Sequence, residues 1–393
     1  MAGIVESPMS ESGEKPLHVL TLTPFYPSTS DDAYGCFVAE VLPFLSEFAI
    51  SNSVMMVQPF YRSRLDSSRD EVPAENKRFF CIPGGIGLAS SGGFLFAKIV
   101  GDVRDMHTSK PISVIHAHSA LPCGHAAALL SRELGIPFVV TVHGLDAFST
   151  VQVRGYAGKW CRRVSEWVYH QASQVICVSE KVRQNVLFGA PSVKTRVVFN
   201  GVDEQKFVPE EANGSSMLCV GNLNSAKGQS LLIRAFATVA VVLPEVTCEF
   251  IGNGPDRESL RTLARELGIE SRVKFRDRQS RREVARAMRE CLLFALPSRY
   301  EALGCVYLEA MSCGKAAIGC RGQGIDEVIE HGVNGWLVDP ENLDQLTQAI
   351  LEFTRNEFLR KSMGIAARET ILGGFTLAHQ AESLAEVYRA CVS

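Results

Sequence analysis

The chain has 393 residues, of which 46% are hydrophobic and 21% are charged, and its formal net charge is -3. This length exceeds that of a typical single domain, so we expect two domains. Division after Glu204 gives 18 basic and 19 acidic residues, then 22 and 24, so neither half has the basic excess of a nucleic-acid-binding protein.

The N-terminal stretch MAGIVESPMSESGEKP has neither a basic region nor an apolar region, so it is not a secretory signal. We expect residues 1–15 to form a disordered tail. No apolar run in the sequence is long enough to span a bilayer. The 12 cysteines form no CxxC pair and show no zinc-binding spacing with histidine. They indicate reduced thiols in a cytoplasmic protein.

The first half of the chain alternates between predicted strands and predicted helices. The segment 92–110 mixes phenylalanines and aliphatic residues with Lys98 and Arg104. It fits either an amphipathic core helix or a helix that rests on a membrane interface. Residue type and spacing predict strands at 17–22, 113–117, 137–142 and 174–178, and helices at 37–48, 124–134 and 159–172.

A second alternating series follows the turn-rich segment 199–209, where we place the domain boundary. The fold class is therefore α/β, with two tandem Rossmann-like, doubly wound domains at 16–205 and 206–375. Such folds bind ligands at the carboxyl ends of their strands, and two facing domains form a cleft. The second series predicts strands at 216–220, 247–251, 273–275, 292–296, 315–319 and 335–338, and helices at 229–242, 257–267, 281–289 and 306–313.

Two glutamates, Glu301 and Glu309, lie in the stretch SRYEALGCVYLEA between a predicted strand and a predicted helix. We expect Glu301 in the loop past the strand and Glu309 on the second helical turn. Leu303, Gly304 and Cys305 would form the first turn, whose free amides attract anions and whose glycine lets a phosphate approach. The two carboxylates could then accept hydrogen bonds from sugar hydroxyls. The alternative is that both are ordinary exposed side chains outside the core.

Two further segments place polar residues directly after predicted strands. VGNLNSAKG (220–228) contains Gly221, Asn222 and Lys227, and it could present amides and one ammonium group to a diphosphate. It is not a Walker A loop, because the GxxxxGK[ST] order is absent. VVTVHGLDAF (139–148) places His143 at the end of another strand. The alternatives are an ordinary βα loop with a solvated lysine and a structural histidine.

The sequence indicates neither a metal nor a dinucleotide cofactor. Asp-x-Asp occurs nowhere, so a divalent cation that holds a diphosphate is not indicated. The loop after the first strand lacks the GxGxxG fingerprint, which argues against a dehydrogenase. From Arg257 to Arg289 there are 11 basic and 5 acidic residues, which we interpret as a solvated arginine-rich face rather than a surface for an anionic partner.

The order of these motifs resembles that of the family-4 retaining glycosyltransferases of the GT-B fold. The resemblance runs from Leu17 to about Tyr388 and includes the E-x7-E motif of Glu301 and Glu309, followed by EAMSCG. It also includes VGNLNSAKG, VTVHGLDAF, YGCFVAEVLPFL (34–45), NGVDEQKF (200–207) and GIDEVIEHGVNGWLVDP (324–340). It implies transfer of a hexose from a nucleotide-diphosphate sugar to a hydroxyl acceptor with retained anomeric configuration.

The resemblance also implies roles for particular residues. Glu301 would bind hydroxyls of the donor sugar, Glu309 the ribose, and Lys227 the leaving diphosphate. His143 would bind the sugar near the reacting carbon. The segment 376–393 would cross back to the N-terminal domain. The other implied positions are the amides near Leu303, Gly304 and Cys305 at the sugar and the distal phosphate, Gly221 and Asn222 in the phosphate loop, and Gly35 on the acceptor side.

The resemblance implies a sugar-nucleotide donor, with a UDP-sugar favoured over a GDP-sugar. No further cofactor is expected, and no metal, because Asp-x-Asp is absent. The acceptor would be a glycan or a lipid-linked intermediate of polysaccharide biosynthesis, reached in the cytoplasm or at the inner membrane face. Family members often carry arginine beside the phosphate-loop glycine, where this chain has Asn222. Arg299 and Arg321 are the candidates to supply the missing charge. A sugar-nucleotide epimerase and a non-catalytic sugar-nucleotide sensor are the alternative functions.

Overall fold

The computed structural model describes residues 15–62, 72–149, 153–210 and 214–393, so nearly all of the predicted tail 1–15 lies outside the described residues. The chain forms two compact units. Unit 1 contains the chain up to Val178 together with Val182–Val198 and Gln380–Ser393, and unit 2 contains Ser179–Lys181 and Phe199–His379. The main division between the units, after Val198, therefore lies before the predicted boundary at 205.

The segments on either side of unit 2 explain this difference in boundary. The Val202 amide donates to the Phe375 carbonyl over 2.9 Å, and the Leu377 amide donates to the Val202 carbonyl over 3.2 Å. Val202 and Thr376 therefore form a parallel bridge. Because the incoming and outgoing segments pair with each other, 199–205 and 376–379 belong to unit 2.

The sheet of unit 1 has seven strands in the order β3-β2-β1-β4-β5-β6-β7, and its pairings are parallel. Every residue of β1, β4 and β5 is buried, as expected of a parallel sheet that is covered on both faces. The strands are β1 (Leu17–Thr23), β2 (Ile50–Pro59), β3 (Ala74–Phe79), β4 (Val114–His118), β5 (Phe138–Val142), β6 (Gln174–Cys177) and β7 (Thr195–Val197).

The predicted helix at 37–48 is wrong in its extent. The structure has a four-residue helix α1 (Cys36–Ala39) and then a 3-10 segment from Pro43 to Phe48. Proline has no backbone N–H to continue an α-helix, which accounts for the break. The segment 92–109 lies within the long helix α2, which begins before residue 92 and ends one residue before the predicted segment. The remaining helices of unit 1 are α2 (Gly85–Ser109), α3 (His125–Leu134), α4 (Gly155–Gln171) and α5 (Glu180–Gly189).

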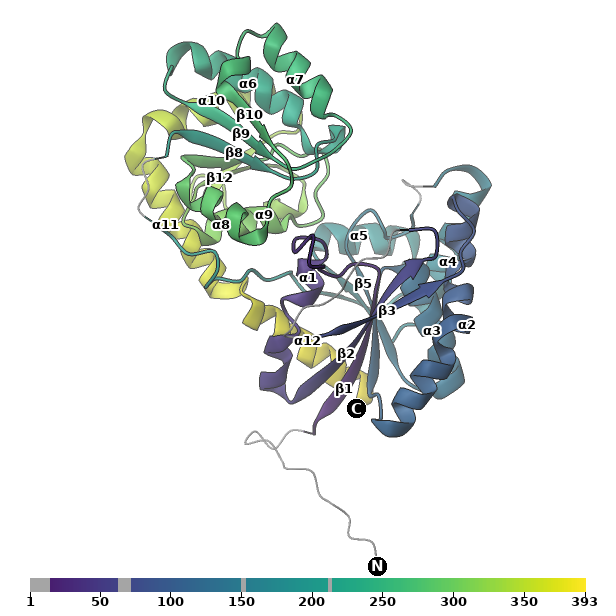
Figure 1. Cartoon of the computed structure of the whole chain (residues 1–393). Helices are drawn as coiled ribbons and strands as arrows, with labels where there is room; N and C mark the ends of the chain where they lie inside the picture. The colour runs from purple at the N-terminus through teal and green to yellow at the C-terminus, as the bar shows by residue number, and fades with distance from the viewer. Residues whose placement is uncertain (1–14, 63–71, 150–152, 211–213) are drawn as a thin grey trace, which may run out of the picture. The chain divides into compact units, whose positions relative to one another are not determined.

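The C-terminal helix α12 (Leu377–Val392) packs on unit 1 with most of its length. Figure 1 shows α2, α3 and α4 on one face of the first sheet and α12, in yellow, on the other. The Tyr388 hydroxyl lies 2.7 Å from Nδ1 of His116 on β4. Arg389 donates to the Phe48 carbonyl over 2.8 Å. These contacts attach α12 to β4 and to the 3-10 segment Pro43–Phe48.

The sheet of unit 2 has six strands in the order β10-β9-β8-β11-β12-β13, and its pairings are parallel. Figure 1 shows α6, α7 and α10 on one face of this sheet and α8 and α9 on the other. The strands are β8 (Ser216–Val220), β9 (Thr247–Ile251), β10 (Val273–Arg276), β11 (Leu293–Ala295), β12 (Ala317–Cys320) and β13 (Gly335–Val338). The helices are α6 (Gln229–Val242), α7 (Arg257–Glu266), α8 (Arg281–Glu290), α9 (Cys305–Ser312), α10 (Leu343–Arg355) and α11 (Glu357–Gly374).

The two parallel doubly wound sheets confirm the predicted fold class. The 12 cysteines are all free, and all but Cys305 and Cys391 are buried. Among the described residues, no helix combines the length and the apolar character that crossing a membrane requires.

Candidate active site

The carboxyl ends of β8 and β11 lie side by side, because these two strands pair in parallel at the centre of the second sheet. The loop after β8 carries Lys227, and the loop after β11 carries Glu301. Nζ of Lys227 lies 2.6 Å from Oε2 of Glu301. Two loops that are far apart in the sequence thus bring together two of the residues that were expected to contact the donor.

Gly228 fixes how closely these two loops approach. Its φ is +71°, and a Cβ at this position would lie 2.0 Å from the carbonyl oxygen of Pro297. The Arg299 amide donates to the Ala226 carbonyl over 2.8 Å, which connects the loops a second time. Asn224 caps the short 3-10 turn by accepting from the Ala226 amide over 3.1 Å. Lys227 is therefore held by backbone geometry as well as by its ion pair.

Glu301 is buried, with only 9% of its surface exposed, so it is not an ordinary loop residue in contact with water. Its Oε2 accepts a hydrogen bond from Ser298 Oγ over 3.2 Å in addition to the Lys227 contact. The Glu301 backbone amide donates to Oε1 of Gln323 over 3.1 Å. The ammonium group of Lys227 and the carboxylate of Glu301 therefore balance each other's charge at this edge of the sheet.

Glu309 is more deeply buried, at 3% exposed, and it pairs with the buried guanidinium of Arg281 at the start of α8. The same guanidinium lies over the ring of Phe207, 4.9 Å from its centroid. The alternative in which both glutamates are exposed side chains outside the core is therefore wrong, because helix packing between α8 and α9 encloses Glu309. Arg281 was not among the predicted site residues, because the stretch from Arg257 to Arg289 was interpreted as a solvated face.

Gly304 was expected in the first turn of the helix, but it precedes the helix as its N-cap residue. It has a φ of +87°, and α9 begins at Cys305. A Cβ on Gly304 would lie 2.6 Å from the ring of Tyr307 and 2.9 Å from Cγ of Glu301, so a side chain is excluded there. Leu303 is buried at 1% exposed. Cys305 is half-buried, and the desolvation of its thiol raises the pKa to about 12, so this thiol is neutral.

Asn222 does not contact either of the arginines that were expected to compensate for it. Arg299 pairs with Glu341 at 2.8 Å, and Arg321 lies 3.5 Å from Asp339. Instead, Arg278 donates to Oδ1 of Asn222 over 3.2 Å. The sequence signal for Arg278 was its place just after β10, but the whole basic stretch was interpreted as a solvated face.

In unit 1, His143 follows β5 and lies against a second histidine. Its Nε2 is 3.0 Å from Nδ1 of His118, and the two rings are inclined by only 14°. The ring of Phe37 lies 4.8 Å away between centroids. Burial lowers the pKa of His143 to about 3, so the imidazole is neutral at pH 7. Its Nδ1 is a buried atom with no hydrogen-bond partner among the described residues.

Gly35 is the N-cap residue of α1, with a φ of +76°. A Cβ at Gly35 would lie 2.4 Å from the carbonyl carbon of Phe25, so the first loop packs directly on its backbone. Phe25 in turn contacts His143, with ring centroids 6.1 Å apart. Gly35 and His143 therefore belong to one cluster in unit 1, whereas the other expected site residues belong to unit 2.

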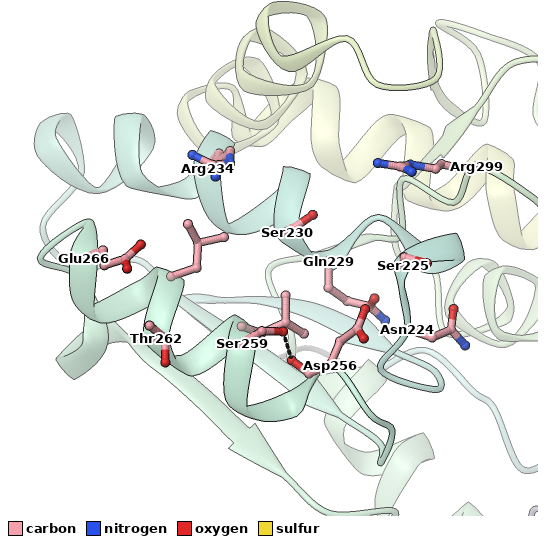
Figure 2. Close-up of a pocket in the computed structure, with 12 residues that line it drawn as sticks. Asn224, Ser225, Gln229, Ser230, Arg234, Asp256, Ser259, Thr262, Glu266 and Arg299 are labelled. Atoms are coloured by element: carbon pink, nitrogen blue, oxygen red, sulfur yellow. Dashed lines mark hydrogen bonds between the residues drawn. The ribbon is translucent and has the colours of Figure 1, made fainter.

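A separate groove of about 630 Å³ lies between α6 and α7 in unit 2. Figure 2 shows polar side chains around it, including Arg234 and Glu266, with Asn224 and Arg299 at one end. Lys227, Glu301 and Glu309 do not line it. Within the described residues, no group of histidine, cysteine, aspartate and glutamate side chains could hold a metal ion.

Two families match the chain. The family described as Glycosyl transferases group 1 matches residues 202–370, and Glycosyltransferase Family 4 matches residues 57–206. A glycosyltransferase of Methanocaldococcus jannaschii is 31% identical over 268 residues, which is 68% of this chain and 72% of that protein. The alpha-maltose-1-phosphate synthase of Mycolicibacterium smegmatis is 28% identical over 73% of this chain and 81% of its own length.

Solved structures share the fold over nearly the whole chain. Sucrose-phosphate synthase from Thermosynechococcus elongatus superposes with a TM-score of 0.75 at 19% identity, covering 95% of this chain and 98% of that one. Anabaena HepE, solved with UDP and glucose, gives a TM-score of 0.75 at 22% identity, covering 94% of this chain and 99% of that one.

Proposed function

The chain belongs to the family-4 glycosyltransferases of the GT-B fold, and from this membership we propose that it is a retaining enzyme that transfers a hexose from a UDP-sugar to a hydroxyl acceptor. The observation that carries the proposal is the meeting of Lys227 and Glu301 at 2.6 Å beside Gly304, at the carboxyl edge of the second sheet. Ligands of doubly wound folds bind at this edge. The donor is proposed as a UDP-sugar because a structural neighbour, HepE, was solved with UDP and with UDP-glucose.

In the proposed reaction, the bond between the anomeric carbon and the phosphate oxygen breaks while the acceptor oxygen forms a new bond to the same carbon. The acceptor proton passes to the departing phosphate oxygen on the same face, so the configuration is retained. Negative charge grows on the diphosphate in the transition state, and a fixed cation there lowers the barrier. Lys227 supplies this cation, with amides at Gly304 and Cys305 on the distal phosphate.

The other expected residues keep their proposed roles. Glu301 accepts hydrogen bonds from the donor sugar, and Glu309 from the ribose. His143 is neutral, so it contacts the sugar as a hydrogen-bonding group rather than as a cation. We place Gly221 and Asn222 at the phosphates and Gly35 on the acceptor side. We also propose that the enzyme needs no metal, acts in the cytoplasm or at the inner membrane face, and uses a glycan or lipid-linked acceptor.

Acceptor-dependent nucleotide release tests the proposed function. The purified chain is incubated with UDP-glucose, UDP-galactose or UDP-N-acetylglucosamine, with and without a panel of simple sugars and alkyl glycosides, and released UDP is measured. We expect release to require an acceptor, to survive EDTA, and to fall about 100-fold or more in Lys227→Met.

Two outcomes would favour the alternatives. A donor that is converted into its epimer without UDP release would indicate an epimerase. Donor binding with no turnover for any acceptor would indicate a sensor. Loss of activity in EDTA with recovery in Mg²⁺ would contradict metal independence.

A further inference from the structure

The groove between α6 and α7 in unit 2 is polar along nearly all of its wall. Its volume of about 630 Å³ lies within the range of about 300–1,000 Å³ that is typical of small-molecule sites. All of its lining residues except Leu260 and Leu263 are polar or charged. An apolar ligand would leave these groups without hydrogen-bond partners, so the groove favours a polar occupant.

The charged residues that line this groove have both signs. Arg234 and Arg299 carry positive charge, and Asp256 and Glu266 carry negative charge (Figure 2). A ligand with a net charge would meet like charge on part of this wall, which weakens binding. A sugar hydroxyl is neutral and can donate to a carboxylate or accept from a guanidinium group. The lining therefore favours a neutral saccharide over an ion.

One end of the groove shares its wall with the loop after β8, which carries the proposed phosphate-binding residues. Asn224 lines the groove and accepts from the Ala226 amide over 3.1 Å. The buried side chain of Gln229 also lines it and donates to the Asn222 carbonyl over 3.0 Å. The Arg299 amide donates to the Ala226 carbonyl over 2.8 Å. A ligand in the groove would therefore contact three residues that hold this loop.

We propose that this groove is a second carbohydrate site, which binds a neutral saccharide and is coupled to the donor site through the loop after β8. The coupling rests on the proposed function, because that loop would hold the diphosphate, whereas saccharide binding does not. The site is distinct from the donor site, since Lys227, Glu301 and Glu309 do not line the groove. Coupling between two sites is reciprocal, so the saccharide and UDP change each other's affinity by the same factor.

Isothermal titration calorimetry with maltotriose, cellotriose and mannotriose tests the site. We expect at least one of them to bind the wild type and to bind Arg234→Met/Glu266→Met about 10-fold more weakly, because two polar partners are lost. Arg282→Met is the matched control, since Arg282 is an exposed arginine on α8, on the opposite face of the sheet (Figure 1). Equal affinity of the wild type and the double variant would overturn the inference, as would binding of none of the three probes. Binding of glucose 6-phosphate alone would overturn the neutral class of the ligand.

Titration of UDP with and without the bound saccharide tests the coupling. We expect the saccharide to change the UDP affinity of the wild type about 5-fold or more. Gln229→Met removes the bond to the Asn222 carbonyl, so most of this change should disappear while the saccharide still binds. An unchanged UDP affinity in the wild type would overturn the coupling.

Failure of this inference and failure of the proposed function give different results. If the wild type binds UDP but none of the saccharides, the inference fails and the proposed function stands. If a saccharide binds in the groove but the wild type neither binds UDP nor releases it from a donor, the saccharide site stands and the proposed function fails.

Discussion

The two glutamates of the E-x7-E motif lie within one loop and helix, but their side chains have different partners. Glu301 contacts Lys227 at the carboxyl edge of the second sheet. Glu309, on α9, contacts Arg281 on α8. In the proposed reaction, the sugar at Glu301 gains positive charge as the glycosidic bond breaks, while the ribose at Glu309 is unchanged. Only an interaction that strengthens in the transition state raises kcat.

We therefore expect Glu301→Gln mainly to lower kcat, by about 100-fold, and Glu309→Gln mainly to raise the KM of the donor. Steady-state kinetics with UDP-glucose measures both constants, and circular dichroism verifies folding. Because Lys227 and Glu301 touch, the double variant Lys227→Met/Glu301→Gln should cost less than the sum of the single changes. The role assignment is wrong if the two glutamate variants behave alike.

The buried ion pair of Arg281 and Glu309 also predicts an effect on stability. Removal of one partner leaves the other charge buried and uncompensated, which costs about 3–5 kcal/mol. Arg281→Leu should therefore be strongly destabilised in urea unfolding, and Arg281→Leu/Glu309→Leu should recover most of the loss. An Arg281→Leu variant that unfolds within about 1 kcal/mol of the wild type would refute this description of the pair.

At the residue scale, the sequence predicted a shared location for two side chains only where both follow strands of the same parallel sheet. Lys227 and Glu301 were each expected to contact the donor, because each follows a predicted strand of a parallel sheet and the carboxyl ends of such strands share one edge. Arg281 and Glu309 meet because α8 and α9 pack side by side, and no local pattern encodes that packing. For the same reason Arg278 was missed, since its contact with Asn222 depends on where β10 lies in the sheet.

At the scale of elements, Gly228 sets the distance between the loop after β8 and the loop after β11. In Gly228→Ala, the added Cβ would collide with the Pro297 carbonyl, so the loops must separate. We expect UDP affinity to fall at least about 10-fold, because Lys227 and the 297–301 loop lose their arrangement. Gly268→Ala is the matched control, since Gly268 has nearly the same φ, +70°, but no atom within 4 Å of the new Cβ.

Calorimetric titration of both variants with UDP distinguishes the collision from backbone strain. The two variants share the strain of a left-handed residue, so a similar small loss of affinity in both would show that the close approach at Pro297 does not matter. A loss confined to Gly228→Ala would support the structure of the loop pair.

Elements with a strong local pattern were predicted closely. The strand at 247–251 and the helix at 229–242 agree with β9 and α6 in both bounds. The strands β2 and β3 were missed because Ser51, Asn52 and Ser53 interrupt the start of β2, and because β3 is a polar edge strand with the sequence AENKRF. Pairing within the sheet stabilises these segments, and single-sequence patterns do not contain that information.

At the scale of the whole molecule, a cluster of three histidines in unit 1, His116, His118 and His143, predicts a loss of stability in acid. Burial lowers the pKa of His116 and His143 from 6.5 to about 3 and that of His118 well below 6.5. At a pH between the folded and the unfolded pKa values of these histidines, the unfolded chain binds more protons than the folded chain. The stability of the fold therefore decreases as the pH falls below 6.5. Asp146 acts in the opposite sense, because burial raises its pKa from 3.8 to about 6.

Chemical unfolding between pH 7.5 and pH 5 measures this effect. Three histidines outweigh one aspartate, and each unmatched proton changes the unfolding free energy by about 1.4 kcal/mol per pH unit. The variant His116→Gln removes one titrating group, so its stability should depend less steeply on pH than that of the wild type. Equal stability of the wild type at pH 7.5 and pH 5 would contradict the burial of neutral imidazoles.

The central claim is that a sugar nucleotide binds at the carboxyl edge of the second sheet, with its diphosphate at Lys227 and its ribose at Glu309. A crystal structure with UDP tests this claim most directly. We predict phosphate oxygens within hydrogen-bonding distance of Lys227 Nζ and of the amides at Gly304 and Cys305, and ribose hydroxyls at Glu309. UDP bound instead in the groove between α6 and α7, beside Arg234 and Glu266, would contradict the account.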